Sequence, residues 1–313
     1  MADSLMASAS NFIADNNFTP GELQAILTSA LVMSILSLIG CVFNLTVTMA
    51  LKIHHHVLGM MIVWLSLMDF IYNTVGILQT VSVENSLICQ VQSFAVSIGY
   101  GGSLAWSCCF AHSLYINFKK DDIRAVATFY KRYVKICILI AIMLATVSLV
   151  IRPTEIDNDS HTCWPKRKEN SIDWAFVSLE FIPSTTAAIY CLICYFYVIK
   201  KVRRFGGRMY LELLVYPLIM IVCYSPFNIL RLYVQITGVG HGPFWWELSS
   251  IVFANSQGIF NALAYGLSGT LKGGCQRFCQ RKNGVSNDSS QHSTSAIDTE
   301  FPQPSGNLYH NFS

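Results

Sequence analysis

Charged residues are scarce in this sequence. Only 12% of its 313 residues are Asp, Glu, Lys or Arg, while 53% are hydrophobic. A soluble domain carries about 25% charged residues, so most of this chain is not expected to face water. The 11 cysteines are too few and too dispersed for a disulfide scaffold or a zinc module. We therefore expect no metal and no cofactor, and the small net charge of +3 gives no reason to expect a nucleic-acid partner.

The first 22 residues lack both features of a cleavable signal peptide. They contain no Lys or Arg and no long apolar run, whereas a signal peptide needs a basic start and an apolar core. Membrane targeting is therefore expected to depend on the first apolar segment.

Long apolar segments dominate the rest of the chain. A membrane-spanning helix needs roughly 20 mostly apolar residues, because in lipid its amides pair only within the helix. Seven stretches meet this criterion: Ala25 to Leu51, Val57 to Val81, Val91 to Phe118, Tyr133 to Ile151, Trp174 to Ile199, Met209 to Ile236 and Glu247 to Leu267. The seventh is interrupted by polar residues, so six spans are the alternative. The prediction is an all-α bundle of seven spans.

The distribution of positive charge predicts the orientation, since Lys and Arg favour the cytoplasmic side. Of the 21 Lys and Arg residues, 16 fall on one side of the spans and 4 on the other, with Arg231 inside the sixth. The side poor in positive charge carries the N-terminus, which is therefore predicted to be extracellular at the plasma membrane. Glycosylation sequons at Asn17 and Asn158 lie on the same side.

The segments after the spans are polar. A short amphipathic eighth helix is predicted along the inner leaflet, where Cys275 and Cys279 share one face and are candidates for palmitoylation or are ordinary reduced cysteines. The Ser- and Thr-rich tail is expected to be disordered. The expected parts are an outer segment 1–24, a receptor domain 25–268, the amphipathic helix 269–282 and the tail 283–313.

Four polar side chains fall inside the spans, where they are costly and hence candidates for function. They come from the first, second, third and seventh spans and are Asn44, Asp69, Ser103 and Asn261. One interpretation is a hydrated switch cluster that holds sodium or a proton. The other is a satisfied network that only fixes helix packing, and the two are compatible.

Two cysteines lie on the predicted outer side, Cys89 at the mouth of the third span and Cys163 in the loop before the fifth. Disulfides persist on that oxidising side, and the other nine cysteines lie in spans or cytoplasm. A Cys89–Cys163 bridge would close a long loop, worth roughly 4 kcal/mol in a chain-entropy treatment. We therefore predict this disulfide.

Arg231 and Glu180 are ionisable residues in the outer parts of the sixth and fifth spans. One interpretation is an anion anchor at a ligand cavity, with Glu180 as the resting partner of Arg231 and further positive charge from Lys166, Arg167 and Lys168 above. The alternative is that Arg231 extends to the lipid headgroups.

Prolines interrupt two of the spans, Pro183 in the fifth and both Pro217 and Pro226 in the sixth. Proline removes a backbone donor and kinks a helix, and such a kink is a place where a helix can swing. Tolerated kinks without motion are the alternative.

Several short motifs lie along the spans: Tyr216-Pro217-Leu218-Ile219 leading to Arg231, Gln257-Gly258 with Asn261-Ala262 and Tyr265-Gly266, Cys163-Trp164, Phe181-Ile182-Pro183, and Trp106 with Leu114-Tyr115. With these motifs the chain from Ala25 to Lys282 resembles the cyclic-AMP-receptor-like family of seven-helix receptors. The Gln257-Gly258 pair is also similar to secretin-type and adhesion-type receptors.

Weaker similarity connects the chain to rhodopsin-like receptors. Cys223-Tyr224-Ser225-Pro226 and Asn261-Ala262-Leu263-Ala264-Tyr265 stand where those receptors have Cys-Trp-x-Pro and Asn-Pro-x-x-Tyr. The chain lacks their Asp-Arg-Tyr triplet, since His112, Ser113 and Leu114 occupy that region, and its fourth span has no Trp. These departures favour the cyclic-AMP-receptor-like resemblance.

This resemblance implies coupling to a heterotrimeric G protein but does not identify the ligand. We expect a non-enzymatic receptor for an extracellular ligand, for which a small anion or a cyclic nucleotide is a candidate. The basic inner residues expected to meet the G protein are Lys119, Arg124, Lys131, Arg132, Lys200, Lys201, Arg203 and Arg204. A seven-helix transporter or channel is the alternative. A retinal-binding pigment is excluded, because Glu247 to Leu267 contains no Lys for a Schiff base.

Overall fold

The computed structural model describes residues 18–52, 57–78, 86–120, 123–151, 154–156, 163–165, 177–205, 215–237 and 242–267. Almost all of these residues are helical. Several predictions lie outside the described residues: the amphipathic helix 269–282 with Cys275 and Cys279, the tail 283–313, the sequons at Asn17 and Asn158, and Lys166, Arg167 and Lys168.

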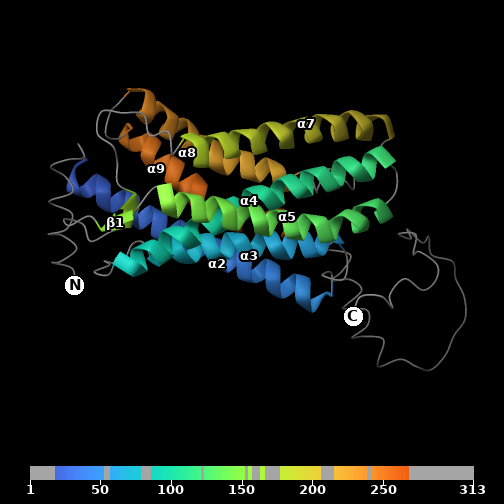
Figure 1. Ribbon diagram of the computed structural model, residues 1–313, viewed down its shortest axis with the longest axis horizontal. Helices are drawn as coiled ribbons and strands as arrows, with labels where there is room; N and C mark the ends of the chain where they lie inside the picture. Colours follow the sequence, from blue (N-terminus) through green and yellow to red (C-terminus); the bar gives the residue numbers. More distant parts are fainter. Residues whose placement is uncertain are drawn as a thin grey trace, which may run out of the picture. The chain divides into compact units, whose positions relative to one another are not determined.

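Long helices run alongside one another in the described chain (Figure 1). In order, they are α2 (Pro20–Ala50), α3 (Val57–Leu78), α4 (Ser86–Lys120), α5 (Ile123–Ile151), a π-helix η2 (Val177–Phe181) that continues into α7 (Ile182–Phe205), α8 (Val215–Thr237), α9 (Phe244–Asn255) and α10 (Gln257–Leu267). Two short strands, β1 (Thr154–Ile156) and β2 (Cys163–Pro165), pair antiparallel between α5 and η2, with Ile156 opposite Cys163.

Six of these helices are long and apolar enough to cross a membrane. They are α2, α3, α4, α5, α7 and α8, which correspond to the first six predicted spans. The seventh predicted span differs, because it consists of α9 with 12 residues and α10 with 11. The two meet at Ser256, and each alone is shorter than the roughly 20 residues that a span requires.

The start of α2 is encoded locally. Thr19 is the N-cap, and its hydroxyl accepts a hydrogen bond from the amide of Glu22 at 3.3 Å. The Glu22 carboxylate in turn accepts one from the Thr19 amide at 2.8 Å, and Pro20 follows the cap. This capping box satisfies helix-end donors that would otherwise have no partner.

The break between α9 and α10 is held by a side chain from α2. The Ser37 hydroxyl donates a hydrogen bond to the carbonyl of Asn255 and accepts one from the amide of Ile259 at 3.4 Å. Backbone groups at a helix end have no partner within the helix, and a serine can replace that partner. Ser37 thus satisfies the chain on both sides of Ser256.

Glycines bring α2 and α10 into close contact. A Cβ at Gly258 would lie 2.8 Å from the Ser37 carbonyl oxygen and 2.8 Å from the Cys41 sulfur. A Cβ at Gly40 would lie 2.8 Å from the Gly258 carbonyl oxygen. Only glycine leaves room for two backbones at this separation.

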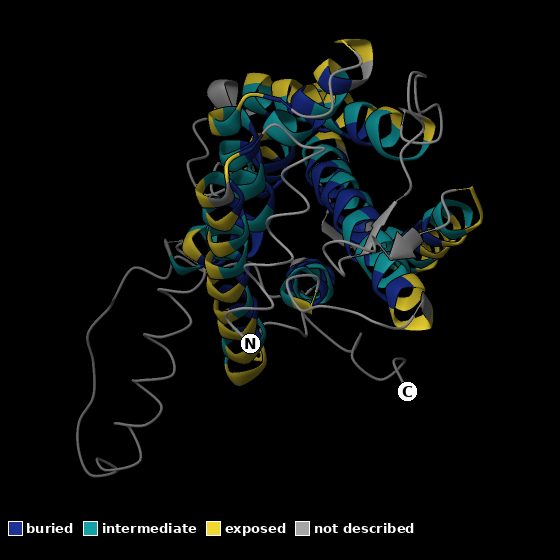
Figure 2. Ribbon diagram, turned by 90° about the vertical axis from the view of Figure 1, so that its left-hand side faces the viewer, coloured by how far each residue is buried: buried dark blue, intermediate teal, exposed yellow. Residues whose placement is uncertain are grey.

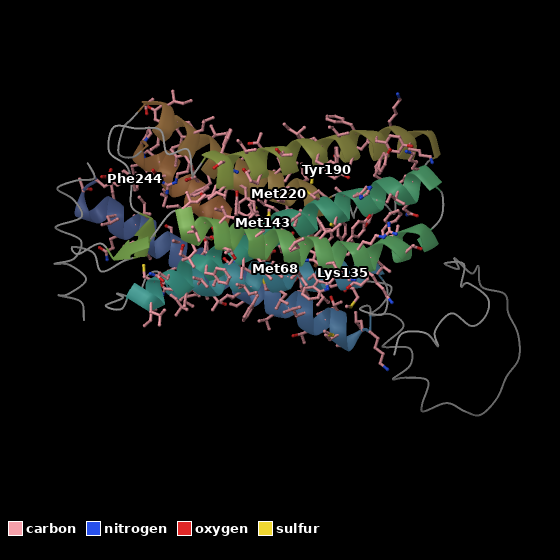
Figure 3. The ribbon with its side chains drawn as sticks, viewed as in Figure 1. Met68, Lys135, Met143, Tyr190, Met220 and Phe244 are labelled. Carbon is pink, nitrogen blue, oxygen red and sulfur yellow. The ribbon has the colours of Figure 1, made fainter. Side chains whose placement is uncertain are left out.

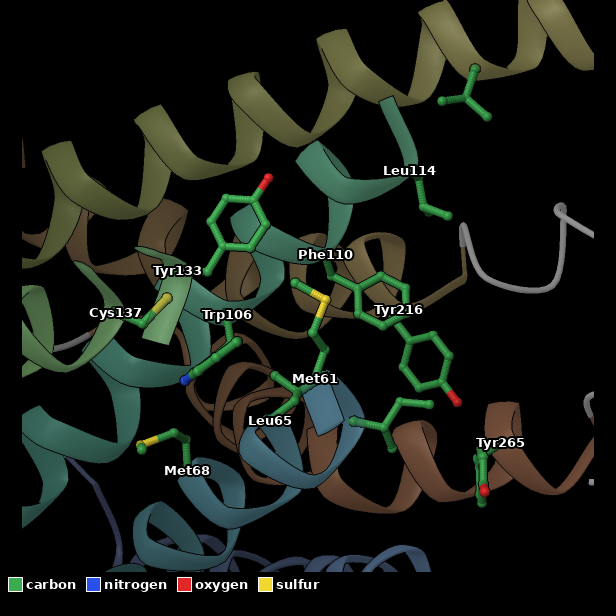
Figure 4. Packing of buried hydrophobic residues seen from close by; sticks show 12 residues of the cluster. Met61, Leu65, Met68, Trp106, Phe110, Leu114, Tyr133, Cys137, Tyr216 and Tyr265 are labelled. Atoms are coloured by element: carbon green, nitrogen blue, oxygen red, sulfur yellow. The ribbon is translucent and has the colours of Figure 1, made fainter. Parts of the chain in front are cut away.

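The core lies between α3, α4, α5, α7, α8 and α10. Figure 4 shows Met61 and Leu65 of α3 beside Trp106 and Phe110 of α4, with Tyr216 of α8 next to Phe110. Their side chains are 1% or 2% exposed.

Large apolar side chains also cover the outside. Figure 2 shows exposed residues along the outward faces of the helices and buried residues on the inward faces. Leu139 of α5 is 67% exposed and Phe196 of α7 is 66% exposed. Apolar surface this extensive is typical of a protein that contacts lipid.

Candidate functional site

A buried polar cluster joins α3, α4 and α10. The carboxylate of Asp69 is 2% exposed and accepts a hydrogen bond from the Ser103 hydroxyl at 2.8 Å and one from the Asn261 amide at 2.7 Å. The structure thus brings together three of the four polar residues that the sequence singled out. In Figure 3, Met68, the neighbour of Asp69, lies between Phe244 near one end and Lys135 toward the other.

Gln257 is a fourth member of the cluster that the sequence analysis did not include. Its amide nitrogen donates to the Ser103 hydroxyl at 2.7 Å, so Ser103 accepts from α10 while it donates to Asp69. Gln257 stands four residues before Asn261 and therefore shares its helix face. That spacing was the sequence signal for Gln257.

Asn44 is buried but does not join this cluster. It is 1% exposed, and neither polar atom of its side chain has a hydrogen-bond partner among the described residues. An unpaired amide inside a membrane protein is costly. Asn44 therefore does not belong to the Asp69 network, and its side-chain amide on α2 can still form hydrogen bonds.

The cluster is rich in oxygen acceptors. Asp69 accepts only neutral donors in the described part of the chain. The side-chain oxygens of Gln257 and Asn261 are buried and have no hydrogen-bond partner among the described residues. Carboxylate, amide and hydroxyl oxygens are the ligands of hard cations. The arrangement is chemically suited to a small cation or to a proton on Asp69.

A cavity of about 110 Å³ lies next to this cluster. Its lining is mainly apolar and aromatic, with Tyr72 from α3, Tyr100 from α4, and Tyr224 and Phe227 from α8. Glu180 of η2 also lines it. Of the described residues that line this cavity, Glu180 is the one with a formal charge.

The cavity and the polar cluster are neighbours along two helices. Tyr72 follows Asp69 by three residues on α3, and Tyr100 precedes Ser103 by three on α4. Residues three apart lie on one helix face, with a rise of about 4.5 Å along the axis. A change at the cavity is therefore only about one helical turn from Asp69.

Arg231 is separate from the cavity lining. Its guanidinium lies over the ring of Phe227, 5.0 Å from the ring centroid. Phe227 itself lines the cavity, as does Glu180. The predicted anion anchor therefore has Arg231 beside the cavity and Glu180 in its wall.

The three prolines have different positions. Pro226 is inside α8, between the cavity residues Tyr224 and Phe227. Pro183 is the second residue of α7, directly after the π-helix η2, a type of irregularity frequent at functional sites. Pro217 falls in the first turn of α8, where a missing amide removes no bond within the helix.

Cys89 is fully buried and disulfide-bonded. The backbone of Cys163 is in β2, which packs against α4, but its side chain lies outside the described residues. The pairing of Cys89 with Cys163 therefore stays a prediction.

The predicted partner-facing residues share one end of the helices. Lys119 lies in the last turn of α4. Lys131 and Arg132 lie in the first part of α5, and Lys200 and Lys201 lie near the end of α7. Arg124 of α5 and Arg203 and Arg204 of α7 have described backbones at the same end. There Lys201 donates a hydrogen bond to the Phe118 carbonyl, and Lys119 lies over the Tyr115 ring.

A scan against models of known protein families finds no match for this chain. A search of curated proteins also finds no match.

Proposed function

We propose that the protein is a G-protein-coupled receptor with seven membrane-spanning helices, an amphipathic eighth helix at 269–282 and an extracellular N-terminus at the plasma membrane. In this proposal α9 and α10 together form the seventh span, broken at Ser256. Their combined length meets the requirement of roughly 20 residues for a span. An odd number of spans also agrees with a tail on the side opposite to the N-terminus.

The observation that carries this proposal is the hydrogen-bonded network of Asp69, Ser103, Asn261 and Gln257. It joins three helices in the middle of the bundle, about one helical turn from the cavity lined by Tyr72 and Tyr100. A buried carboxylate changes its preferred surroundings when it gains or loses a cation or a proton. Such a group favours different helix arrangements in its two states, as a receptor requires.

The mechanism is a population shift. A ligand in the cavity binds more tightly to the arrangement in which the far ends of α7 and α8 stand apart. Pro226 lies beside the cavity on α8 and provides the place where this helix bends. The basic residues at the far ends of α4, α5 and α7 then contact the G protein.

The test measures guanine-nucleotide exchange on a panel of purified heterotrimeric G proteins with the full-length protein in lipid nanodiscs. The receptor proposal expects that the protein accelerates exchange on at least one member of the panel, and that Asp69→Asn changes this rate. Absence of acceleration across the panel, with and without candidate ligands, would contradict it.

A transporter or channel is the second candidate, and the broken α9–α10 helix favours it. Discontinuous helices near the midplane form substrate and ion sites in many transporters. For this function we expect flux of a solute or of sodium into proteoliposomes, with no effect on guanine-nucleotide exchange.

A further inference from the structure

The three tyrosines of the cavity are arranged around one another. The Tyr224 ring is perpendicular to that of Tyr100, with centroids 5.0 Å apart, and perpendicular to that of Tyr72, at 6.4 Å. In this edge-to-face arrangement the rings pack against one another, and all three tyrosines line the cavity. Phe227 also lines the cavity, and its ring is covered by the guanidinium of Arg231.

A carboxylate and an unpaired hydroxyl accompany these rings. Glu180 lines the same cavity. Tyr224 is 3% exposed, and its hydroxyl has no hydrogen-bond partner among the described residues. A buried hydroxyl without a partner is costly. The cavity therefore contains groups that a bound molecule would satisfy.

We propose that this cavity binds the ammonium end of a small organic cation, held by the aromatic rings of Tyr72, Tyr100 and Tyr224 and by the carboxylate of Glu180. Aromatic faces attract cations, and cages of aromatic rings are the usual sites for quaternary ammonium groups. The negative charge of Glu180 supplies the counter-charge and disfavours an anion in the same space. The guanidinium of Arg231 lies over Phe227 instead of lining the cavity.

The cavity volume limits the size of the group. At about 110 Å³ it is smaller than the cavity of about 150 Å³ that accepts benzene in another protein. It fits a methylated ammonium head, while the rest of a larger ligand would extend out of it. The signalling consequence of this binding depends on the proposed receptor function, whereas the binding itself does not.

The experiment measures the melting temperature of the full-length protein in lipid nanodiscs, since a ligand that binds the folded state raises it. The probes are tetramethylammonium, choline and 3,3-dimethylbutan-1-ol, a neutral compound with the shape of choline, and cyclic AMP represents the anions. We expect a concentration-dependent rise with both ammonium compounds and none with the neutral compound. Equal shifts from choline and the neutral compound, or no shift from either ammonium compound, would overturn the proposal.

Substitutions of the cavity residues test whether the ammonium compounds bind in this cavity. Glu180→Gln should raise the choline concentration for a half-maximal shift on the order of tenfold, through the loss of the counter-charge. Tyr224→Leu removes a ring and should weaken the response by a similar factor, whereas Tyr224→Phe keeps the ring and should retain the response to tetramethylammonium. Glu22→Gln, which changes a glutamate outside the cavity, is the matched control and should respond as the unaltered protein does.

The outcomes separate this inference from the receptor proposal. If Glu180→Gln is not recovered in folded form, the comparison of Tyr224→Leu with Tyr224→Phe decides, and equal responses from those two overturn the cage. A choline shift without any guanine-nucleotide exchange supports the cation site and contradicts the receptor. Exchange that depends on cyclic AMP, with no ammonium shift, contradicts the cation site and leaves the receptor proposal in place.

Discussion

Asp69 is the residue on which the polar cluster depends. Its two carboxylate oxygens receive hydrogen bonds from two different helices, α4 and α10. A buried carboxylate without a basic partner is stabilised by a bound cation or by a proton. The number of cations or protons at this site should therefore change as the helices separate.

We predict that Asp69→Asn folds but signals differently, because asparagine keeps the shape and removes the charge. Sodium should alter guanine-nucleotide exchange by the unaltered protein and have less effect on the variant, at equal surface level measured by flow cytometry. Ser103→Ala should act in the same direction. Ser107→Ala is its control, since Ser107 is buried one turn away and its hydroxyl has no partner among the described residues. A normal response to sodium in Asp69→Asn would mean that the cluster only supports packing.

A second prediction at this scale concerns Cys89 and Cys163. Either single alanine substitution should lower surface expression, since loss of a native disulfide typically costs about 2–5 kcal/mol. The double substitution should be no worse than the singles, because both remove the same bond. Mass spectrometry of unreduced protein is the direct measurement, and free thiol at both positions would refute the pairing.

The sequence identified single polar residues better than it identified cavities. Asp69, Ser103 and Asn261 stood out because polar groups are rare in apolar spans. Tyr72, Tyr100 and Tyr224 did not, since tyrosines are common in such helices and only the packing shows which ones share a cavity. Asn44 met the same criterion of depth as Asp69, yet α2 places it outside the hydrogen-bonded network.

At the scale of elements, the backbone of α2 lies in close contact with that of the broken helix α9–α10. It depends on Gly40 and Gly258, and on Ser37, which bonds to the chain on both sides of the break. The contact therefore fixes both the position and the orientation of the broken helix.

We predict that Gly258→Ala destabilises the protein by roughly 1–3 kcal/mol, because the new Cβ would overlap with Ser37 and Cys41. Gly266→Ala on the same helix is the matched control, since no atom lies within 4 Å of a Cβ there. Alanine is the better helix former, so this control should be neutral or stabilising. Thermal unfolding in nanodiscs measures both, and equal melting temperatures would contradict the close contact.

Helix boundaries show where hydropathy fails as a guide. The fourth span was predicted to start at Tyr133, whereas α5 begins at Ile123, because the basic first turns of the helix lie beyond its apolar part. The first span was predicted from Ala25, although α2 begins at Pro20, and the Thr19 to Glu22 capping signature was present in the sequence. The strands β1 and β2 were not predicted, since three-residue strands leave no periodicity to detect.

For the molecule as a whole, charge divides the two ends of the bundle. Lys52, just after α2, and the described Lys and Arg residues of α4, α5 and α7 lie toward one end, and Arg231 of α8 lies toward the other. Orientation follows this asymmetry in membrane proteins.

We therefore predict an extracellular N-terminus and a cytoplasmic tail. Glycosidase treatment of protein from a glycosylating cell should lower its apparent mass, and Asn17→Gln should reduce that change. An epitope tag after Ser313 should bind antibody only after the cells are permeabilised. Binding to intact cells would reverse the orientation.

Because Ser37 bonds to the backbone beside Ser256, hydrogen–deuterium exchange of the amides there can report on the contact between α2 and α10. The amide of Ile259 donates to the Ser37 side chain on α2, whereas the amide of Phe260 donates to the backbone carbonyl of Ser256, four residues earlier, at 3.0 Å. Separation of α2 from α10 would expose the first amide to deuterium and leave the second protected. The ratio of exchange at these adjacent positions would thus report the movement of one helix without any attached label.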